Sequence, residues 1–467
     1  MSLIFLRDKA FFRAMLAIAV PVAVQQLITA GLNMIDVLMV GQLGETSVAA
    51  LGLANQIFFL LILFLFGLAS GTAIFTAQYW GKGDMKKIHR VLGICLVIAV
   101  SIAAIFTLAA TLIPEKLLSF YTEDPEVIRL GSEYLRIVGL SYVLMAISVS
   151  YIFILRSITY VTMTMVVSVI ALLIKTAIGY SLIFGHFGLP ALGVRGAAIG
   201  TAIGWAFEAI LLITLVYVLK TPLAANPLTF FTFDRPFLLN VLRTTMPAVV
   251  NEVVWSFGIT TYNAVYARIG TDSIAAININ ATVEQLVFVM FIGLGNACSV
   301  MAGNKIGEGD KDTAYEYGRR FTILTVMLAL FGGAVVLLTR DVVIGWYSLS
   351  ETAAFNLRNI MLVYSLSVWL RAFNFILFIG ALRAGGDTKF AMYMELLSIW
   401  LIGVPAALIG GFVLHLPVYY VYALVLLEEA VKAIVIYRRF VSRKWIHDLV
   451  NEPLDENPPL STPTPAS

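Results

Sequence analysis

Long uncharged stretches dominate the pattern of hydrophobic and polar positions along this chain. Five of them cover residues 46–81, 91–114, 285–304, 321–339 and 396–427. Each exceeds the ~18 residues that mark a membrane-spanning helix, and none alternates like a strand of a membrane barrel. The pattern predicts an all-α integral membrane protein with twelve transmembrane helices. The predicted spans are 14–40, 48–78, 90–113, 130–154, 160–185, 194–219, 240–267, 273–303, 321–340, 353–381, 390–413 and 417–437.

The residues around the first spans return at an offset of 226 positions. The matching positions are Pro21 and Pro247, Gly44 and Gly270, Ser47-Val48-Ala49-Ala50 and Ser273-Ile274-Ala275-Ala276, and Gly81-Lys82-Gly83-Asp84 and Gly307-Glu308-Gly309-Asp310. Leu155-Arg156 returns one place later, as Leu382-Arg383. One register across separated blocks indicates a duplication of six spans. Because six is even, both halves enter the membrane in the same direction and form a parallel repeat.

This duplication predicts the domain boundaries. Residues 1–219 form the first six-helix lobe and residues 240–445 form the second. The segment 220–239, which contains Pro222, Pro227 and Pro236, is expected to be a cytoplasmic linker. The proline-rich tail 446–467 is expected to be disordered.

Composition and charge distribution support a multi-pass protein of the cell membrane. Hydrophobic residues make up 60% of the chain, charged residues 13%, and the mean hydropathy is +0.91. Counted over loops and helix ends, 21 Lys and Arg residues, Arg156 and Arg383 among them, lie on the side of the N-terminus, against five on the other. The positive-inside rule therefore predicts that both termini are cytoplasmic.

Motifs of enzymatic chemistry are missing from the sequence. Gly81-Lys82 lacks the upstream glycine of a phosphate-binding loop, and no HExxH or CxxC motif occurs. Cys95 and Cys298 both fall in apolar spans, with no disulfide or metal spacing. We therefore expect no enzyme activity, metal, organic cofactor or nucleic-acid partner. A receptor or scaffold would not explain a repeat with acids in both halves.

Several ionisable side chains lie well inside predicted spans. They are Asp36, Lys175, Glu208, Glu252 and Arg371, with Glu284 in a further span. A charge at the bilayer centre costs at least ~2.5–3.5 kcal/mol, so each should face a water-filled cavity or a partner. Asp36 follows Asn33 and is the strongest candidate for loading and releasing a cation or proton. The alternative is a structural acid held by hydrogen bonds.

Glu252 is the second candidate. It follows Asn251, lies one turn after Pro247 and precedes Trp255, and its sequence surroundings suggest no partner. A proline in a spanning helix permits a kink, and a carboxylate beside it could attract a cation. On this reading Glu252→Gln abolishes export and leaves folding near normal. The alternative is a buried acid held by its Asn and Trp neighbours.

Several motifs resemble the multidrug and toxic compound extrusion (MATE) transporters. They are Gly67-Leu68-Ala69-Ser70-Gly71-Thr72-Ala73, Ala77-Gln78-Tyr79-Trp80-Gly81-Lys82-Gly83-Asp84, Leu382-Arg383-Ala384-Gly385-Gly386-Asp387-Thr388, Gly193-Val194-Arg195-Gly196-Ala197-Ala198 and Arg443-Lys444-Trp445. The resemblance covers nearly the whole chain. It implies two pseudo-symmetric six-helix lobes around a central cavity and efflux of organic cations and drugs in exchange for Na⁺ or H⁺. Asp36 falls where the family carries an aspartate of the first span, and Thr201 where a threonine lines the same ion site.

The fifth span departs from the family pattern. Lys175 takes the position of a common Asn, and Gly179 takes that of an Asp four residues later. Gly179 should lie level with Asp36, and Lys175 about 6 Å deeper at ~1.5 Å per residue. A lysine stem covers that distance, so its ammonium could replace a sodium ion beside Asp36. We therefore favour H⁺ over Na⁺ as the coupling ion, against the alternative of a static ion pair.

Together these observations predict a secondary multidrug exporter that works by alternating access. The predicted ion-coupling residues are Asp36, Lys175, Thr201 and Glu252, and the predicted cavity residues are Gln26, Asn33, Asn251, Trp255, Glu284 and Arg371. Its partners would be small organic cations and membrane lipids, and we expect a monomer. The alternative is a flippase for lipid-linked oligosaccharides, which would require a more cationic cavity to bind a pyrophosphate group.

Overall fold

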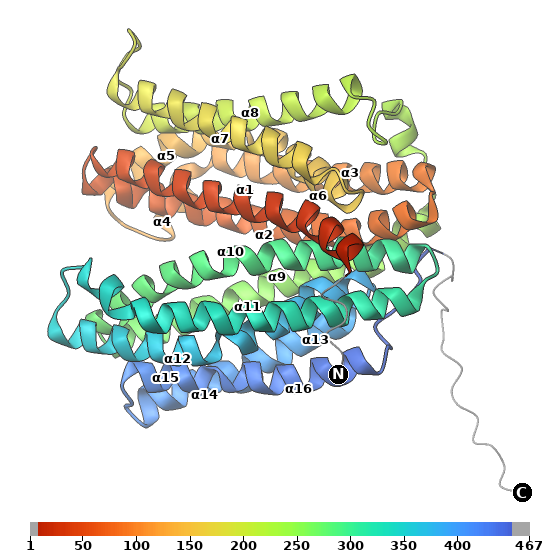
Figure 1. Cartoon of the computed structure of the whole chain (residues 1–467). Coiled ribbons are helices and arrows are strands. Elements are labelled where there is room, and N and C mark those ends of the chain that lie inside the picture. Colours follow the sequence, from red (N-terminus) through yellow and green to blue (C-terminus); the bar gives the residue numbers. More distant parts are fainter. Residues whose placement is uncertain (1–7, 451–467) are drawn as a thin grey trace, which may run out of the picture.

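The computed structural model describes residues 8–450, and helices make up most of this part. The helices of the first half are α1 (Lys9–Gly41), α2 (Glu45–Lys82), α3 (Met85–Leu112), α4 (Pro114–Ser119), α5 (Pro125–Gly139), α6 (Tyr142–Ser157), α7 (Val161–Phe184) and α8 (Val194–Val218). Those of the second half are α9 (Arg235–Ile269), α10 (Thr271–Gly307), α11 (Lys311–Gly345), α12 (Glu351–Phe375), α13 (Thr388–Ser398), α14 (Val404–Leu408), α15 (Val418–Val425) and α16 (Leu427–Val441). The long helices run side by side, with the first half on one side of the molecule and the second half on the other (Figure 1).

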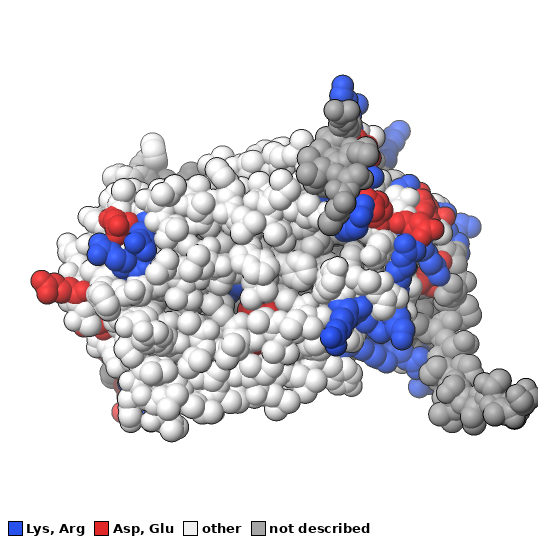
Figure 2. Space-filling view, turned by 60° about the horizontal axis from the view of Figure 1, so that its bottom comes forward, with Lys and Arg blue, Asp and Glu red and all other residues white. Residues whose placement is uncertain are grey.

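The described residues confirm an all-helical membrane protein, whereas the count of twelve spans stays a prediction. By length and hydropathy, nine described helices could cross a membrane, when the continuous stretch Thr388–Val413, which contains α13 and α14, is counted as one helix. The number is ten if α5 and α6, which meet at 53°, form one broken span. The other two predicted spans coincide with α9 and with α15 plus α16, which do not meet this criterion. Polar side chains lower the mean hydropathy of α9. The span formed by α15 and α16 is interrupted at Leu426. Charged side chains gather at the two ends of the molecule, and the broad belt between them is uncharged on this face except for a small patch near its middle (Figure 2).

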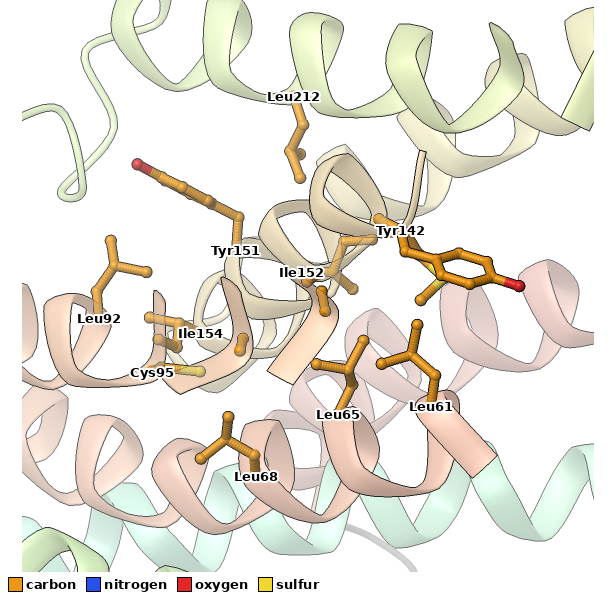
Figure 3. Close-up of a cluster of buried hydrophobic side chains, with 14 of the residues drawn as sticks. Leu61, Leu65, Leu68, Leu92, Cys95, Tyr142, Tyr151, Ile152, Ile154 and Leu212 are labelled. Atoms are coloured by element: carbon orange, nitrogen blue, oxygen red, sulfur yellow. The ribbon is translucent and has the colours of Figure 1, made fainter. Parts of the chain in front are cut away.

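A large apolar core holds the first half together. Leucines of α2 (Leu61, Leu65 and Leu68) point towards Leu92 and Cys95 of α3, Tyr142 and Ile154 of α6, and Leu212 of α8 (Figure 3). All of these side chains are buried. In lipid the surrounding solvent is as apolar as the core, so close packing rather than water exclusion holds these helices together.

Glycines bring the two halves into contact along α2 and α10. A Cβ at Gly67 would lie 2.6 Å from Val249 Cα of α9. One at Gly81 would collide with the backbone carbonyl of Asn304, and one at Gly307 with that of Gln78. The duplicated Gly-x-Gly-Asp motif therefore marks a pseudo-symmetric crossing of α2 and α10, which small residues permit.

The rest of this motif ends one helix and begins the next. Gly83 and Gly309 adopt left-handed backbone conformations (φ +78° and +85°), which favour glycine. Asp84 and Asp310 then cap α3 and α11. Their carboxylates accept hydrogen bonds from the backbone N–H of Lys87 at 3.1 Å and of Thr313 at 3.0 Å.

We expect Gly81→Ala to destabilise the protein by about 1–3 kcal/mol, because the methyl group would push α2 away from α10. The matched control is Gly52→Ala in the same helix, where a Cβ would meet nothing within 4 Å. That change should be neutral or stabilising by ~0.5–1 kcal/mol, since alanine favours a helix interior. Thermal unfolding in detergent measures both variants. Equal shifts in Tm would contradict the crossing at Gly81.

Two boundaries differ from those predicted. Helix α9 begins at Arg235, so the connection between the halves is shorter than the predicted 220–239. Within this connection, Phe230 is buried against Gly93 of α3. Residues 446–450 belong to the packed structure, because Leu449 is buried and its backbone N–H donates to Gln78 Oε1 at 3.0 Å. The rest of the predicted disordered tail, 451–467, lies outside the described residues.

Candidate functional site

Two adjoining cavities open inside the helical bundle. The first, of about 700 Å³, is lined by helices of the first half. The second, of about 670 Å³, is lined mainly by helices of the second half. Gln26, Phe153 and Arg156 line both cavities, so the two meet at these side chains.

Asp36 and Lys175 form an ion pair in the first cavity. Lys175 Nζ lies 2.6 Å from Asp36 Oδ2, and the two side chains are 21% and 25% exposed. Helix α8 approaches α7 closely here, because a Cβ at Gly204 would lie 2.7 Å from Lys175 Cβ. The pairing predicted from helix pitch is therefore confirmed, and α8 packs against the base of the lysine stem.

The other predicted residues of this half lie around the same cavity. Asn33 and Thr201 both line it, and Thr201 Oγ1 donates to the carbonyl of Ala197 at 3.0 Å. Glu208 also lines it and accepts a hydrogen bond from Ser168 Oγ at 2.6 Å. Glu208 is buried, and within residues 8–450 it forms no salt bridge, although the charge of Arg156 acts on it from a longer distance.

Glu252 has a partner that the sequence did not suggest. Arg383 Nη2 donates to Glu252 Oε1 at 2.5 Å, and the arginine side chain is only 4% exposed. Ser70 of α2 accepts a second hydrogen bond from this guanidinium at 3.2 Å. The view of Glu252 as an unpaired acid is therefore wrong. Glu252 and Arg383 form a buried charge pair, and Arg383 also contacts Ser70 of the first half.

Glu284 and Arg371, both predicted to line the cavity, form a second pair there. Arg371 Nη1 donates to Glu284 Oε2 at 2.6 Å, and Tyr422 donates to Oε1 of the same carboxylate at 2.5 Å. Asn251 and Trp255 line the same cavity. The five candidates in the second half therefore converge on one volume.

A cluster of three acids around Lys432 completes the second cavity. Lys432 Nζ lies 3.4 Å from Glu395, 3.5 Å from Glu429 and 4.0 Å from Glu428. Tyr262 also donates a hydrogen bond to Glu428 at 2.5 Å. Within residues 8–450 no group of three or more His, Cys, Asp or Glu side chains is arranged to hold a metal ion.

The sequence does not identify two arginines of the cavities. Arg156 and Arg383 count by position as positive charges of loops and helix ends, and Arg156 does lie in the last turn of α6, but both side chains line cavities. Helix ends in a membrane protein usually carry interfacial charges, which explains the error. The signal that could have identified both was the duplicated Leu-Arg pair.

At the end of the molecule that carries Asp8 and Val450, Asp387 joins the start of α13 to α16 and the final segment. Arg439 Nε donates to Asp387 Oδ2 at 2.7 Å, and His447 Nε2 lies 3.7 Å from Oδ1. Burial favours the neutral carboxyl, but His447 and Arg439 outweigh it and hold the pKa of Asp387 below its ordinary value.

This pKa predicts a pH dependence of stability. A carboxyl whose pKa is lowered by folding stabilises the protein above its unfolded pKa of ~3.9, and this contribution is lost as the pH falls through the folded pKa. We expect Asp387→Asn to lower Tm at pH 7. The difference from wild type should shrink below about pH 4. A difference independent of pH would contradict the ionic contact; thermal unfolding of both proteins across pH provides the measurement.

Membrane-length helices in two sequence-related halves, surrounding cavities lined by paired charges, define a multi-pass membrane transporter. A family model described as MatE matches residues 21–181 and again residues 247–409, in the register of the internal repeat. The chain belongs to the MATE family of transporters, which is not a family of enzymes. The resemblance inferred from the motifs is confirmed.

Individual relatives agree with this assignment. A probable multidrug resistance protein NorM of Rhizobium meliloti is 30% identical over 403 residues, covering 84% of this chain and 85% of the relative. The multidrug resistance protein PmpM of Pseudomonas aeruginosa is 26% identical, covering 86% and 84%. A solved structure of an outward-facing multidrug resistance MATE transporter superposes with a TM-score of 0.82 at 20% identity, covering 92% of this chain and 96% of that one. This last likeness supports the fold.

Proposed function

We propose that this chain exports small organic cations, drugs among them, from the cell in exchange for H⁺. The observation that carries the proposal is the excess of carboxylates over basic side chains around the two cavities. A cavity with excess negative charge attracts cations. The relatives that are named as multidrug resistance proteins make drugs the natural substrates to test. The two lobes would rock about the cavities to alternate access.

The choice of H⁺ over Na⁺ rests on the contact between Asp36 and Lys175. An ammonium group 2.6 Å from the carboxylate already supplies the positive charge that a bound sodium ion would provide. Protonation of Asp36 would cancel this attraction and release the lysine. Loading and release of one proton would thereby change the contact between α1 and α7 and drive the conformational cycle.

The alternative of a flippase for lipid-linked oligosaccharides has less support. A pyrophosphate would need several basic groups without acidic partners. Lys175, Arg371, Arg383 and Lys432 each pair with at least one carboxylate. The positive charge of the cavities is therefore largely neutralised by the protein itself.

Uptake of a fluorescent cationic dye into inverted membrane vesicles tests this function. Gradients of pH and of Na⁺ are imposed separately, and vesicles without the protein serve as the control. We expect uptake under the pH gradient in the absence of Na⁺. Uptake that requires Na⁺ would contradict the coupling ion, and uptake under neither gradient would contradict secondary export.

We also propose that both termini lie in the cytoplasm, in keeping with the excess of Lys and Arg at that end. Leu228, which is 74% exposed, lies between the halves, and Phe120, which is 85% exposed, lies at the opposite end. In intact cells an impermeant thiol reagent should label Phe120→Cys and spare Leu228→Cys. Native Cys95 and Cys298 are buried and should react with neither. The reverse labelling pattern would invert the topology.

A further inference from the structure

The duplication places an arginine at matching positions of the two halves, Arg156 and Arg383. The register that relates Pro21 to Pro247 also relates Gln25-Gln26 to Asn251-Glu252. In the second half the arginine donates to Glu252 at 2.5 Å, so its charge is neutralised within the protein. The corresponding position in the first half is Gln26, a neutral amide. The repeat has therefore kept the arginine and lost its counter-charge.

The contacts of Arg156 agree with this difference. Its Nη2 donates to the amide oxygen of Gln25 at 2.7 Å, and its buried Nε has no hydrogen-bond partner among the described residues. Within the same residues no carboxylate lies in salt-bridge distance of the guanidinium. Of the acids in this cavity, Asp36 pairs with Lys175, whereas Glu208 accepts a hydrogen bond from Ser168 and acts on the guanidinium electrostatically from beyond salt-bridge distance.

A buried guanidinium with an unsatisfied Nε and no carboxylate in direct contact costs free energy unless an anion binds to it. Arg156 lies where the two cavities meet and lines both, with its Cζ 5.9 Å from the centre of the Phe153 ring. We infer that Arg156 binds a carboxylate group of the transported compound. The substrate then supplies to Arg156 the negative charge that Gln26 lacks, as Glu252 supplies it to Arg383 in the second half.

This inference rests on the proposed function and narrows its substrate class. The second cavity contains more acids than basic groups and suits a cationic amine. A compound with a carboxylate on Arg156 and an amine in the second cavity spans the junction. The preferred substrates are thus zwitterions that carry both groups, rather than simple cations.

Binding of a matched dye pair to the purified full-length protein tests this. The probes are a cationic xanthene dye with a free benzoic acid group and the methyl ester of the same dye, followed by fluorescence anisotropy. Because the acid can accept charged hydrogen bonds from Arg156 that the ester cannot, the wild type should bind the acid at least about tenfold more tightly than the ester. Equal affinities, or no binding of the acid, would overturn the inference.

Two variants locate the effect. Arg156→Gln removes the guanidinium, and Gln26→Glu supplies the internal counter-charge that the second half already has. Either should reduce the preference for the acid to less than about twofold. Gln42→Glu makes the same chemical change at the exposed end of α1 and should keep the preference. Preference retained in both Arg156→Gln and Gln26→Glu would also overturn the assignment.

The two proposals fail in different ways. Gradient-driven export of the methyl ester, without a preference for the acid in binding, would overturn the inference about Arg156 and leave cation export standing. A clear preference for the acid, without export of either dye under any gradient, would overturn the proposed export and leave the carboxylate site standing.

Discussion

Replacing Asp36 with asparagine should abolish dye export driven by a pH gradient, and replacing Lys175 with asparagine should make export depend on Na⁺. Asparagine at position 36 cannot take up or release a proton, so the step that changes the contact between α1 and α7 is lost. Asparagine at position 175 removes the ammonium that lies 2.6 Å from Asp36 and leaves room for a hydrated or partly dehydrated cation. Both variants are measured in inverted vesicles with separate pH and Na⁺ gradients.

A matched control is Lys305→Asn, which breaks an ion pair of the same length, Lys305 with Glu308, at an end of α10. This contact lies outside both cavities and should not change the coupling ion. Export by Asp36→Asn at the wild-type rate would show that the pair is only structural. Pure proton dependence of Lys175→Asn would mean that the lysine does not replace a sodium ion.

Replacing Glu252 with glutamine should destabilise the protein by ~3–5 kcal/mol as well as impair export, because it leaves the Arg383 guanidinium buried without its counter-charge. The sequence alone, which suggests no partner for Glu252, predicts near-normal folding of Glu252→Gln. The contact with Arg383 predicts a loss of stability instead. The double variant Glu252→Gln with Arg383→Gln should be more stable than Glu252→Gln alone, because it removes both charges. Thermal unfolding of the purified proteins gives the comparison.

The control for this series is Glu308→Gln, whose carboxylate is 41% exposed and pairs with Lys305 at 2.6 Å. An exposed pair contributes about 0–1 kcal/mol, so this variant should differ little from wild type. A stability of Glu252→Gln close to that of Glu308→Gln would contradict a strong internal pair. Loss of export in Glu252→Gln at unchanged stability would then return Glu252 to the role of an ion-coupling acid.

Pairings that depend on local helix geometry were accessible from the sequence. Lys175 lies one turn from Gly179, and the family pattern places that turn opposite Asp36, so the rise per residue was enough to predict the contact. The partner of Glu252 was not accessible in this way. Arg383 is 131 residues away and lies near the end of a predicted span, where a charge usually contacts the membrane surface.

By itself the sequence determined that this chain is a duplicated, all-helical membrane protein with charge inside its spans. Hydropathy, the register of the repeat and the family motifs are all properties of position along the chain, so they need no coordinates. Only the tertiary structure decided which charges neutralise one another and that Arg156 lies between two cavities with no carboxylate in salt-bridge distance. The physical reason is that a buried ion pair depends on how helices from both halves cross, and the crossing of α2 and α10 at Gly81 and Gly307 is set by packing between distant segments.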